Sequence, residues 1–205
     1  MIDTIYVDEA LIVLNKPAGL LCVPGRGADK QDCLSARVQA EFPDALIVHR
    51  LDMGTSGIVV MARNLAVQRD LGAQFAHRQV TKRYVATVAG IVTADCTIDL
   101  PIGFDWNLRP LRIIDPVHGK PSTTRLQVVH RDTMLETTQV LLEPLTGRTH
   151  QLRLHLQAIG HPILGDALYA PPAVQALSER LMLHASYLKL VHPLTRDYCE
   201  FHAAN

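Results

Sequence analysis

The sequence lacks both a cysteine motif and a long apolar run. Its cysteines are Cys22, Cys33, Cys96 and Cys199. They lie far apart and form no CxxC pair, which indicates reduced, packed thiols and not a disulfide framework. No apolar stretch approaches the roughly 18 residues that a spanning helix needs, and acidic residues interrupt the apolar N-terminal segment. We therefore expect a cytoplasmic protein with neither signal peptide nor membrane span.

The sequence also lacks an excess of charge of either sign. Twenty Lys and Arg residues balance 20 Asp and Glu residues, which argues against a protein whose whole surface attracts polyanions. The charge is unevenly distributed, because residues 49–83 hold six basic and two acidic side chains, residues 101–131 five and two, and residues 145–165 two and none. This pattern indicates local basic surfaces, although ordinary charge scatter on a globular surface is the alternative.

No Ser/Gly linker, low-complexity tract or internal repeat interrupts the chain. We therefore predict a single catalytic domain over residues 1–205. Helices are expected over 34–42, capped by Asp32, from 64 onward, capped by Asn64, and from 147 to 160. Strands are expected at 5–7, 11–14, 46–48, 57–62, 80–89, 123–129, 134–142, 181–191 and 198–202. Strands outnumber helices and several follow one another directly, which predicts an α+β fold with a mixed, mainly antiparallel sheet and flanking helices.

The stretch HRLDMGTSG, residues 49–57, places Asp52 beside an apolar run. A carboxylate in such a loop is typical of an Asx turn or a helix cap. Here Arg50, Thr55 and Ser56 offer donors that would keep the carboxylate ionised and oriented, and the glycines allow close approach of the backbone. Asp52 is therefore a candidate catalytic residue.

A second polar cluster, TGRTHQ at residues 146–151, opens the third predicted helix. Backbone N–H groups at a helix start favour anions, and the planar fork of Arg148 suits a bidentate contact with a carboxylate or phosphate. The plain alternative is a capped helix start with a surface arginine. Because Asp52 requires a partner, we predict a buried Arg148–Asp52 ion pair.

A third cluster, Lys82-Arg83-Tyr84, lies in a strand that alternates polar and apolar residues. A tyrosine in such a strand commonly packs on the sheet. The functional alternative is a ring that stacks on a base beside two cations that contact phosphate.

The histidines do not form a recognisable metal site. His150, His155 and His161 lack the spacing of HExxH or of a cysteine–histidine site, so no metal is predicted. Ser56 lies near His49, but no Gly-x-Ser-x-Gly elbow supports acyl transfer.

In these motifs the chain resembles the pseudouridine synthases that act on ribosomal and transfer RNA, in the subgroup named for ribosomal large subunit pseudouridine synthase A. The matching segments are KPAG at 16–19, HRLDMGTSG at 49–57, KRY at 82–84, GRTHQLR at 147–153, GHPILGD at 160–166 and LHA at 183–185. Residues 23–26 and 105–110 further resemble the dual-specificity members, whose substrates are both ribosomal and transfer RNA. The resemblance implies a pseudouridine synthase catalytic domain without an S4-type RNA-binding domain.

The resemblance implies an isomerisation, in which the N1–C1′ bond of a uridine breaks and C5 joins C1′. Asp52 would attack covalently or remove the C2′ proton, and no cofactor is required. Arg50 would fill the space left by the flipped base, and Arg148 would hold Asp52. Tyr84 would stack on the uracil and act as base for the C5 proton, and Leu188 would form the floor of the pocket.

We predict catalytic roles for Asp52, Tyr84 and Arg148. Further substrate or RNA contacts are predicted for Lys16, His49, Arg50, Thr55, Lys82, Arg83, His150, Arg153 and Leu188. The expected partner is a stem-loop of 23S ribosomal RNA, of transfer RNA, or of both, bound by a monomer without an obligate protein partner. Two alternatives stay open. One is a non-catalytic RNA-binding or chaperone protein, and the other is a hydrolase, for which Asp166 would be the second carboxylate, although it fits a turn or an ion pair better.

Overall fold

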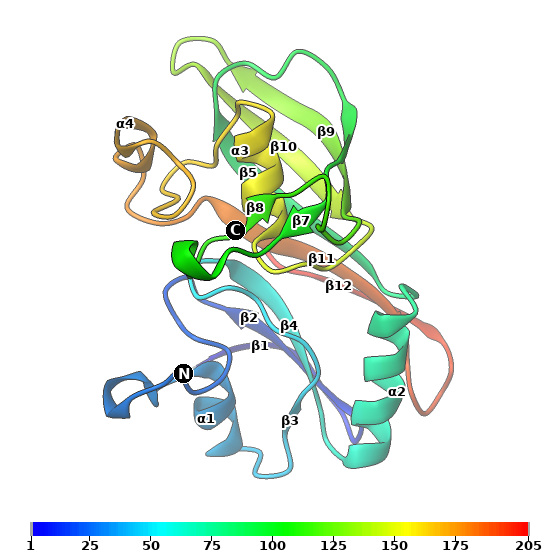
Figure 1. Cartoon of the computed structure of the whole chain (residues 1–205). Coiled ribbons are helices and arrows are strands. Elements are labelled where there is room, and N and C mark those ends of the chain that lie inside the picture. Colours follow the sequence, from blue (N-terminus) through cyan, green and yellow to red (C-terminus); the bar gives the residue numbers. More distant parts are fainter. Residues whose placement is uncertain (1, 205) are drawn as a thin grey trace. The chain divides into compact units, whose positions relative to one another are not determined.

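The computed structural model describes residues 2–204, which form two compact units. The first unit comprises Met1–Lys82 and His184–Asn205, and the second comprises Arg83–Leu183. Both combine strands with a small number of helices, which confirms the predicted α+β class (Figure 1). Whether the two units act as the single predicted domain stays a prediction.

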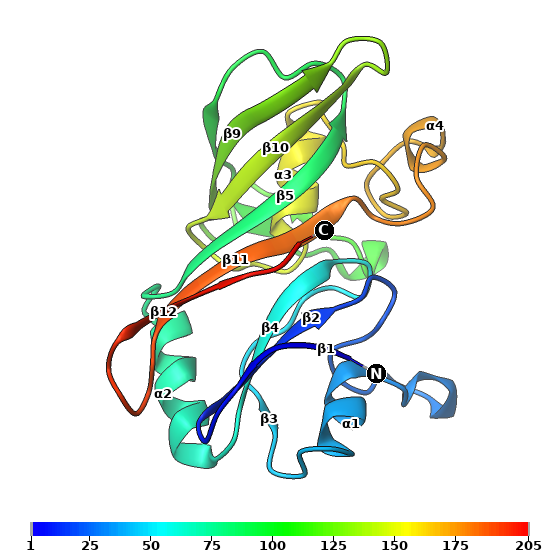
Figure 2. The ribbon, with the colours of Figure 1, turned by 180° about the vertical axis from the view of Figure 1, so that it is seen from behind.

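The strands of the first unit are β1 Asp3–Val7, β2 Leu11–Lys16, β3 Leu46–Ile47, β4 Ser56–Ala62, β11 Leu183–Val191 and β12 Tyr198–His202. β1 pairs with β2, β2 and β3 pair with β4, and β12 pairs with β11, all antiparallel (Figure 2). β11 pairs with β4 in parallel, so the sheet is mixed, as predicted. β4 is paired along both edges and every one of its residues is buried, which requires cover on both faces and explains its unbroken apolar run.

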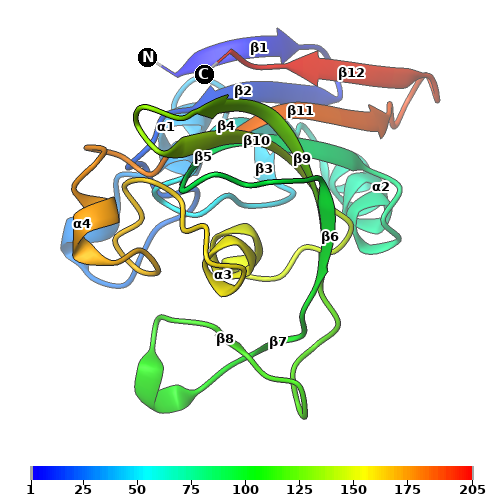
Figure 3. The same ribbon diagram turned by 90° about the horizontal axis from the view of Figure 1, so that it is seen from above.

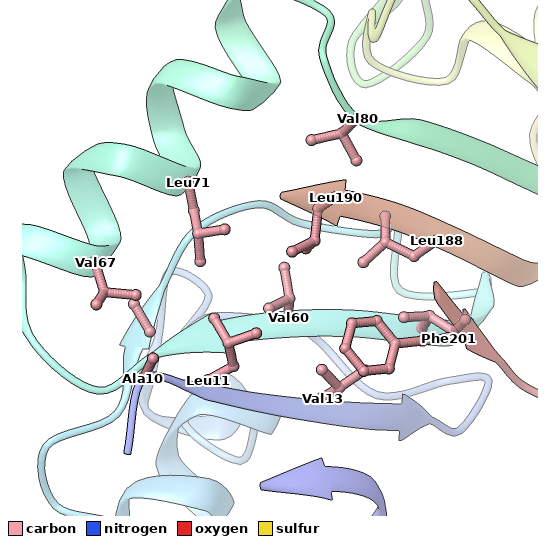
Figure 4. Packing of buried hydrophobic residues seen from close by; sticks show 12 residues of the cluster. Ala10, Leu11, Val13, Val60, Val67, Leu71, Val80, Leu188, Leu190 and Phe201 are labelled. Atoms are coloured by element: carbon pink, nitrogen blue, oxygen red, sulfur yellow. The ribbon is translucent and has the colours of Figure 1, made fainter. Parts of the chain in front are cut away.

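The helix α2, Leu65–Ala76, covers one face of these strands. Asn64 caps it as predicted, since its side chain accepts from the backbone N–H of Val67 at 2.9 Å. Figure 4 shows Val67 and Leu71 facing Val60 of β4, within one hydrophobic core. The spacing of the apolar residues along the helix thus corresponds to its buried face.

The helix α1, Leu34–Gln39, begins differently from the prediction. Asp32 does not cap it, because the N-cap residue is Cys33 and the carboxylate of Asp32 pairs with Arg37 at 2.6 Å. The first N–H groups of the helix instead donate to backbone carbonyls of the preceding loop, Leu34 to Leu21 at 2.7 Å among them. A tertiary contact has replaced the local cap.

Gly57 enables the close parallel pairing of β4 with β11. Its φ is +108°, and a Cβ atom at this position would overlap the backbone of Ala185. Any side chain here would therefore separate the two strands or distort the end of the Asp52 loop.

The second unit contains the strands β5 Thr81–Ala89, β10 Thr137–Pro144, β9 Thr123–Asp132 and β6 Cys96–Asp99, each antiparallel to the next in this order. A small hairpin of β7 Ile102–Gly103 and β8 Ile113–Ile114 encloses the 3-10 helix η2, Trp106–Leu108. Two further short helices of the chain are η1 Ala28–Lys30 in the first unit and α4 Pro172–Gln175 in the second.

The helix α3, Gln151–Ala158, contacts both β10 and β8 in the second unit (Figure 3). Leu152 and Leu156 of α3 join Val88, Val140 and other strand residues in a second hydrophobic core. The sequence predicts a helix start at residue 147, but the helix begins at residue 151. The reason is that His150 has a left-handed backbone with φ of +58°. Residues 147–150 therefore form a turn that precedes the helix.

Candidate active site

The loop that carries Asp52 is supported by the ammonium group of Lys16. Lys16 is fully buried at the end of β2, and its Nζ donates to the carbonyls of Pro17 and Leu20 at 2.8 Å and of Met53 at 3.1 Å. Burial lowers the pKa of Lys16 to about 8, although the charge of Asp52 acts in the opposite direction. The three carbonyls use the three donors of an ammonium, so Lys16 has a structural role, and its contact with RNA stays a prediction.

Cys22 supports the same loop on the other side of Asp52. Its buried Sγ lies 3.2 Å from the backbone nitrogen of Leu51, from which it accepts, and 3.3 Å from the Leu51 carbonyl, to which it donates. Burial raises the pKa of this thiol, so it keeps the proton that it donates. The backbone N–H of Gly19 adds a bond of 2.9 Å to the Met53 carbonyl. The residues before and after Asp52 are thus both held in place.

Asp52 itself is half-buried and begins a tight turn. The backbone N–H of Thr55 closes this turn by donating to the Asp52 carbonyl at 3.1 Å, and Thr55 is buried. Arg50 is exposed, as the predicted insertion into an RNA stack requires. The loop therefore presents one carboxylate and one accessible guanidinium from a rigid backbone.

His49 is explained by packing. Its ring stacks on Phe75 with centroids 4.5 Å apart, and its Nε2 accepts the backbone N–H of Val60 at 3.1 Å. Burial, with a smaller effect of the Lys82 charge, lowers the pKa of His49 to about 3, so the ring is neutral near pH 7. Lys82 lies 5.9 Å from the same Phe75 ring, and burial lowers its pKa. These contacts give His49 a structural role, and its contact with RNA stays a prediction.

Two other residues of the first unit also have structural partners. Leu188 is buried in the core that Figure 4 shows, and its role as a pocket floor stays a prediction. Ser56 contacts Nδ1 of His184 at 2.9 Å, and Nε2 of His184 lies 3.2 Å from the Ala203 carbonyl. The second nitrogen of His184 therefore contacts a backbone carbonyl, whereas in an acyl-transfer triad it would contact a carboxylate.

In the second unit, the side chain of Gln151 organises the turn that carries Arg148. Its buried amide oxygen accepts from the Arg148 backbone nitrogen at 3.0 Å and from the Thr146 hydroxyl at 2.7 Å. Its amide nitrogen donates to the Thr123 carbonyl and to the Thr124 hydroxyl, both at 3.0 Å. One side chain thus fixes the turn to β9.

Arg148 is half-buried and has an incomplete set of hydrogen bonds. Its Nη2 lies 3.5 Å from the Pro121 carbonyl, which is a long contact. Among the residues that the structure describes, its Nε is buried and has no hydrogen-bond partner. A buried guanidinium donor without an acceptor is uncommon in a folded protein and marks a position suited to an anion.

The next residues of this segment form a chain of contacts. Nδ1 of His150 lies 2.8 Å from the Tyr169 hydroxyl. The guanidinium of Arg153 forms a bidentate pair with the buried carboxylate of Asp166, at 2.8 and 2.6 Å. Asp166 also accepts from the backbone nitrogens of Leu168 and Tyr169, so it anchors both a turn and an ion pair, as anticipated. Burial and this pairing give Arg153 a structural role, and its contact with RNA stays a prediction.

The strand β5 carries the third predicted cluster. Tyr84 is half-buried opposite Leu142 of β10 and packs against the core of the second unit. Arg83 is exposed, with its Nε 4.0 Å from a Glu143 carboxylate oxygen. Its contact with RNA phosphate stays a prediction.

The structure groups the predicted residues by unit. Asp52, Arg50 and Thr55 share one loop of the first unit. Arg148 and His150 share one turn of the second unit. Tyr84 belongs to the same unit but lies in β5. The ion pair between Asp52 and Arg148 joins residues of different units and stays a prediction.

The histidines considered for a metal each bind protein groups. His155 contacts the Thr124 hydroxyl and the Leu100 carbonyl, both at 3.0 Å, and His161 contacts the Ala89 carbonyl at 2.9 Å. Within residues 2–204 there is no group of three or more His, Cys, Asp or Glu side chains suited to a metal ion. The same part of the chain contains no helix that is long and apolar enough to cross a membrane.

Comparison with known proteins decides the family. Residues 10–158, which include the loop of Asp52 and the turn of Arg148, match the family model of RNA pseudouridylate synthases. The chain belongs to the RNA pseudouridylate synthase family. It is thus an RNA-modifying isomerase, as the motifs indicated.

Relatives of this family are similar over most of their length. The dual-specificity RNA pseudouridine synthase RluA of Yersinia pestis is 47% identical over 190 residues, which cover 92% of each protein. The RluA protein of Escherichia coli K12 is 44% identical over 200 residues, covering 97% of this chain and 91% of the relative. The human RNA pseudouridylate synthase domain containing 1 superposes with a TM-score of 0.85 at 31% identity, covering all of this chain and 84% of its own.

Three supporting residues of this pseudouridylate synthase escaped the sequence analysis, namely Cys22, Gln151 and Tyr169. Each acts through a contact with a residue distant in sequence or with a backbone atom. A partial signal existed for Gln151, because it directly follows the GRTH segment. Cys22 and Tyr169 carry no local signal, since their partners are defined by tertiary packing.

Proposed function

We propose that this protein converts uridines of structured RNA to pseudouridine with Asp52 as the catalytic carboxylate. The observation that carries the proposal is the loop of the half-buried Asp52, whose neighbours Leu51 and Met53 are both held by buried side chains. Such a loop fixes the backbone that carries the one carboxylate this isomerisation requires.

The reaction is balanced without an external reactant. The N1–C1′ bond of the uridine breaks, the uracil rotates and C5 bonds to C1′, while the C5 proton leaves and N1 gains a proton. Asp52 either attacks covalently or removes the C2′ proton to give a glycal, and either route needs one carboxylate. No water is consumed, so no second carboxylate is needed to activate one.

The other catalytic residues surround this reaction. Tyr84 stacks on the flipped uracil and accepts the C5 proton, and Arg148 pairs with Asp52. The buried Nε of Arg148 supports this role, because a carboxylate or phosphate would provide the acceptor that it lacks. Extruding the base costs a few kcal/mol of stacking and pairing, and Arg50, which is exposed, would occupy the vacated space.

A hydrolase is less well supported, because its second carboxylate is committed elsewhere. Asp166 is fully buried and holds both the guanidinium of Arg153 and two backbone N–H groups. Burial raises the pKa of Asp166, but these donors outweigh burial and lower it below the usual value. It is therefore neither accessible nor poised to protonate a leaving group.

The substrates we propose are stem-loops of both ribosomal and transfer RNA. The relatives named as dual-specificity synthases support this breadth, since they match at 44–47% identity over more than nine tenths of the chain. We further propose that the protein acts in the cytoplasm as a monomer with residues 1–205 forming one catalytic domain. Thr55, Lys82, Arg83 and His150 complete the proposed set of residues near the RNA.

Release of tritium from uracil C5 tests the proposal, because the product is an isomer and has an unchanged mass. The purified protein is expected to release tritium from stem-loop transcripts of transfer and ribosomal RNA in the presence of a chelator and without nucleotide. Asp52→Asn removes the nucleophile and base, so release should fall by at least about 10³-fold. RNA binding should persist, because the carboxylate contributes little to phosphate contacts.

Asp32→Asn is the matched control, since Asp32 is an exposed carboxylate in an ion pair with Arg37. This variant should release tritium at the rate of the unaltered protein. Undiminished release by Asp52→Asn would overturn the assignment of Asp52, and absence of release by the unaltered protein would favour the non-catalytic alternative.

A further inference from the structure

The hairpin loop between β7 and β8 exposes aromatic side chains that neither core accounts for. Trp106 is 71% exposed and Phe104 40% exposed, although side chains of this size are usually buried. Trp106 is the single tryptophan of the sequence. The rings lie 5.2 Å apart in an edge-to-face arrangement, so they form one surface feature.

Two arginines of the same loop lie against these rings. The guanidinium carbon of Arg109 is 3.1 Å from the centroid of Trp106 and 5.6 Å from that of Phe104. The guanidinium of Arg112 lies 4.5 Å from the Phe104 centroid. We call Phe104, Trp106, Arg109 and Arg112 the arginine–aromatic cluster. Trp106 thus keeps its large exposed fraction although Arg109 lies over one face of its ring.

The carboxylates of the loop are used for backbone capping. Asp105 accepts from the backbone nitrogen of Asn107 at 2.9 Å. Asp115 accepts from the backbone nitrogens of Val117 at 3.0 Å and His118 at 2.9 Å. These carboxylates therefore bind the backbone of the loop, whereas the guanidiniums of Arg109 and Arg112 lie against the aromatic rings.

The loop is anchored to the turn that carries Arg148. The backbone nitrogen of Arg112 donates to the Tyr169 hydroxyl at 2.8 Å, and the same hydroxyl lies 2.8 Å from Nδ1 of His150. At its base, Ile102 and Lys120 exchange backbone hydrogen bonds of 3.0 and 2.9 Å. The cluster thus belongs to the same unit as Arg148. The Tyr169 hydroxyl connects the cluster to His150 in the turn of Arg148.

We propose that the arginine–aromatic cluster binds an unpaired nucleotide of the RNA substrate, whose base stacks on the open face of Trp106 while Arg109 and Arg112 contact the adjoining phosphates. The proposal rests on the proposed function, since the RNA substrate brings the nucleotide to this surface. Proteins commonly recognise RNA loops by stacking unpaired bases on aromatic rings and arginine planes. The alternation of rings and cations fits a chain of bases and phosphates, whereas an apolar protein partner would leave the two guanidinium charges without an acceptor.

The position of Trp106 makes the proposal directly measurable. Because no other tryptophan is present, the fluorescence of the intact protein reports on this surface. Titration with a synthetic RNA stem-loop that has an unpaired loop should quench the emission, and a blunt RNA duplex of the same composition should quench it far less. Equal quenching by the two RNAs, or none by either, would overturn stacking on Trp106.

Substitutions provide the second readout. Trp106→Ala should raise the dissociation constant and KM for the stem-loop by about 10- to 100-fold, with kcat at saturating RNA unchanged. Trp106→Phe should retain most of the affinity because it keeps a stacking surface. Tyr198→Ala is the matched control, since Tyr198 is an exposed ring, 72% accessible, with Lys189 4.9 Å from its centroid in the first unit. Equal affinity of Trp106→Ala and the unaltered protein would contradict the proposal.

The two proposals fail in different ways. If the protein releases C5 tritium but Trp106→Ala binds and turns over RNA normally, the cluster is not a binding surface and the proposed function stands. If stem-loops quench Trp106 but no tritium is released, the cluster binds RNA and the proposed reaction is wrong.

Discussion

The loop of Asp52 and the turn of Arg148 are held by different kinds of contact. The loop rests on the buried ammonium of Lys16 and the buried thiol of Cys22, both of which contact main-chain atoms. The turn depends on the amide of Gln151, which connects it to β9 through side-chain hydrogen bonds. Loss of the charged Lys16 should therefore appear mainly as lost stability, and loss of the neutral groups of Gln151 or Cys22 should appear mainly as lost turnover.

This difference has a physical basis in desolvation. A buried ammonium is stable while all of its carbonyl partners are present. Removing the ammonium leaves several buried carbonyls without a donor. The turn is held by the neutral amide of Gln151, whose loss costs less than the loss of a buried ammonium, so we expect the turn to stay folded but to lose its geometry. The following substitutions separate the two cases, beginning with the largest expected effect.

Replacement of Lys16 by methionine should have the largest effect. Lys16→Met leaves the carbonyls of Pro17, Leu20 and Met53 without their shared donor, so the free energy of unfolding should fall by about 3 kcal/mol. Urea denaturation measures the change. Lys30→Met is the control, because Lys30 is exposed, and its unfolding midpoint should match that of the unaltered protein. Equal midpoints for both variants would show that the Asp52 loop does not depend on this ammonium.

Protonation of His49 in acid should cause the next largest loss in the free energy of unfolding. The folded pKa of about 3 lies below the usual 6.5, so protons bind preferentially to the unfolded chain and stability is lost as the pH falls from about 6.5 toward 3. Between pH 7 and 4.5 this residue should cost about 2.5 kcal/mol, because a protonated Nε2 cannot accept from Val60. His49→Gln should lack this loss in unfolding experiments across that range. His118→Gln, at an exposed position, should titrate like the unaltered protein, and parallel curves for all three proteins would contradict the assignment.

Substitution of Gln151 tests the other half of the comparison. Gln151→Leu removes the acceptor of the Arg148 N–H and the bonds to β9, so kcat should fall about 30-fold, equivalent to about 2 kcal/mol. The unfolding midpoint should fall less than in Lys16→Met. Gln151→Glu keeps the acceptor oxygen and should have an intermediate kcat. Gln127→Leu, an exposed glutamine on β9, serves as the control, and a loss of stability without a loss of kcat would contradict the role of this turn.

The smallest effect is expected at Cys22. Cys22→Ala removes both contacts with Leu51 and should slow tritium release about fivefold, equivalent to about 1 kcal/mol. Cys22→Ser restores a donor and an acceptor, so it should recover most of the rate. Cys96→Ala changes an exposed thiol and should be neutral. A serine variant no better than the alanine variant would indicate that the thiol acts by packing alone.

Much of the fold follows from local patterns in the sequence. The apolar run after Gly57 predicts a buried strand, and Asn64 predicts the start of α2, because both depend on neighbours within a few residues. The start of α1 could not be predicted, because its first N–H groups donate to backbone carbonyls of the loop at Leu21. Asp32 is therefore not needed as a cap and pairs with Arg37. The start of α3 depends on the left-handed backbone of His150, whose side chain contacts Tyr169 19 residues away.

The same division applies to the candidate site. Motifs identify Asp52, Arg148 and Tyr84 as candidates, but motifs record only which residue types occur and not which are buried. Sequence reasoning assigned RNA contacts to Lys16, His49 and Arg153, and only the structure shows that each also has a structural partner, namely carbonyls, a stacked ring or a buried carboxylate.

By itself, the sequence determines the α+β class, the helical faces and the family, because these depend on periodicity and on ordered motifs. Only the tertiary structure decides which polar side chains support the loops and which remain open to RNA. The reason is that the cost of burying a charge depends on partners that the chain brings together from distant positions.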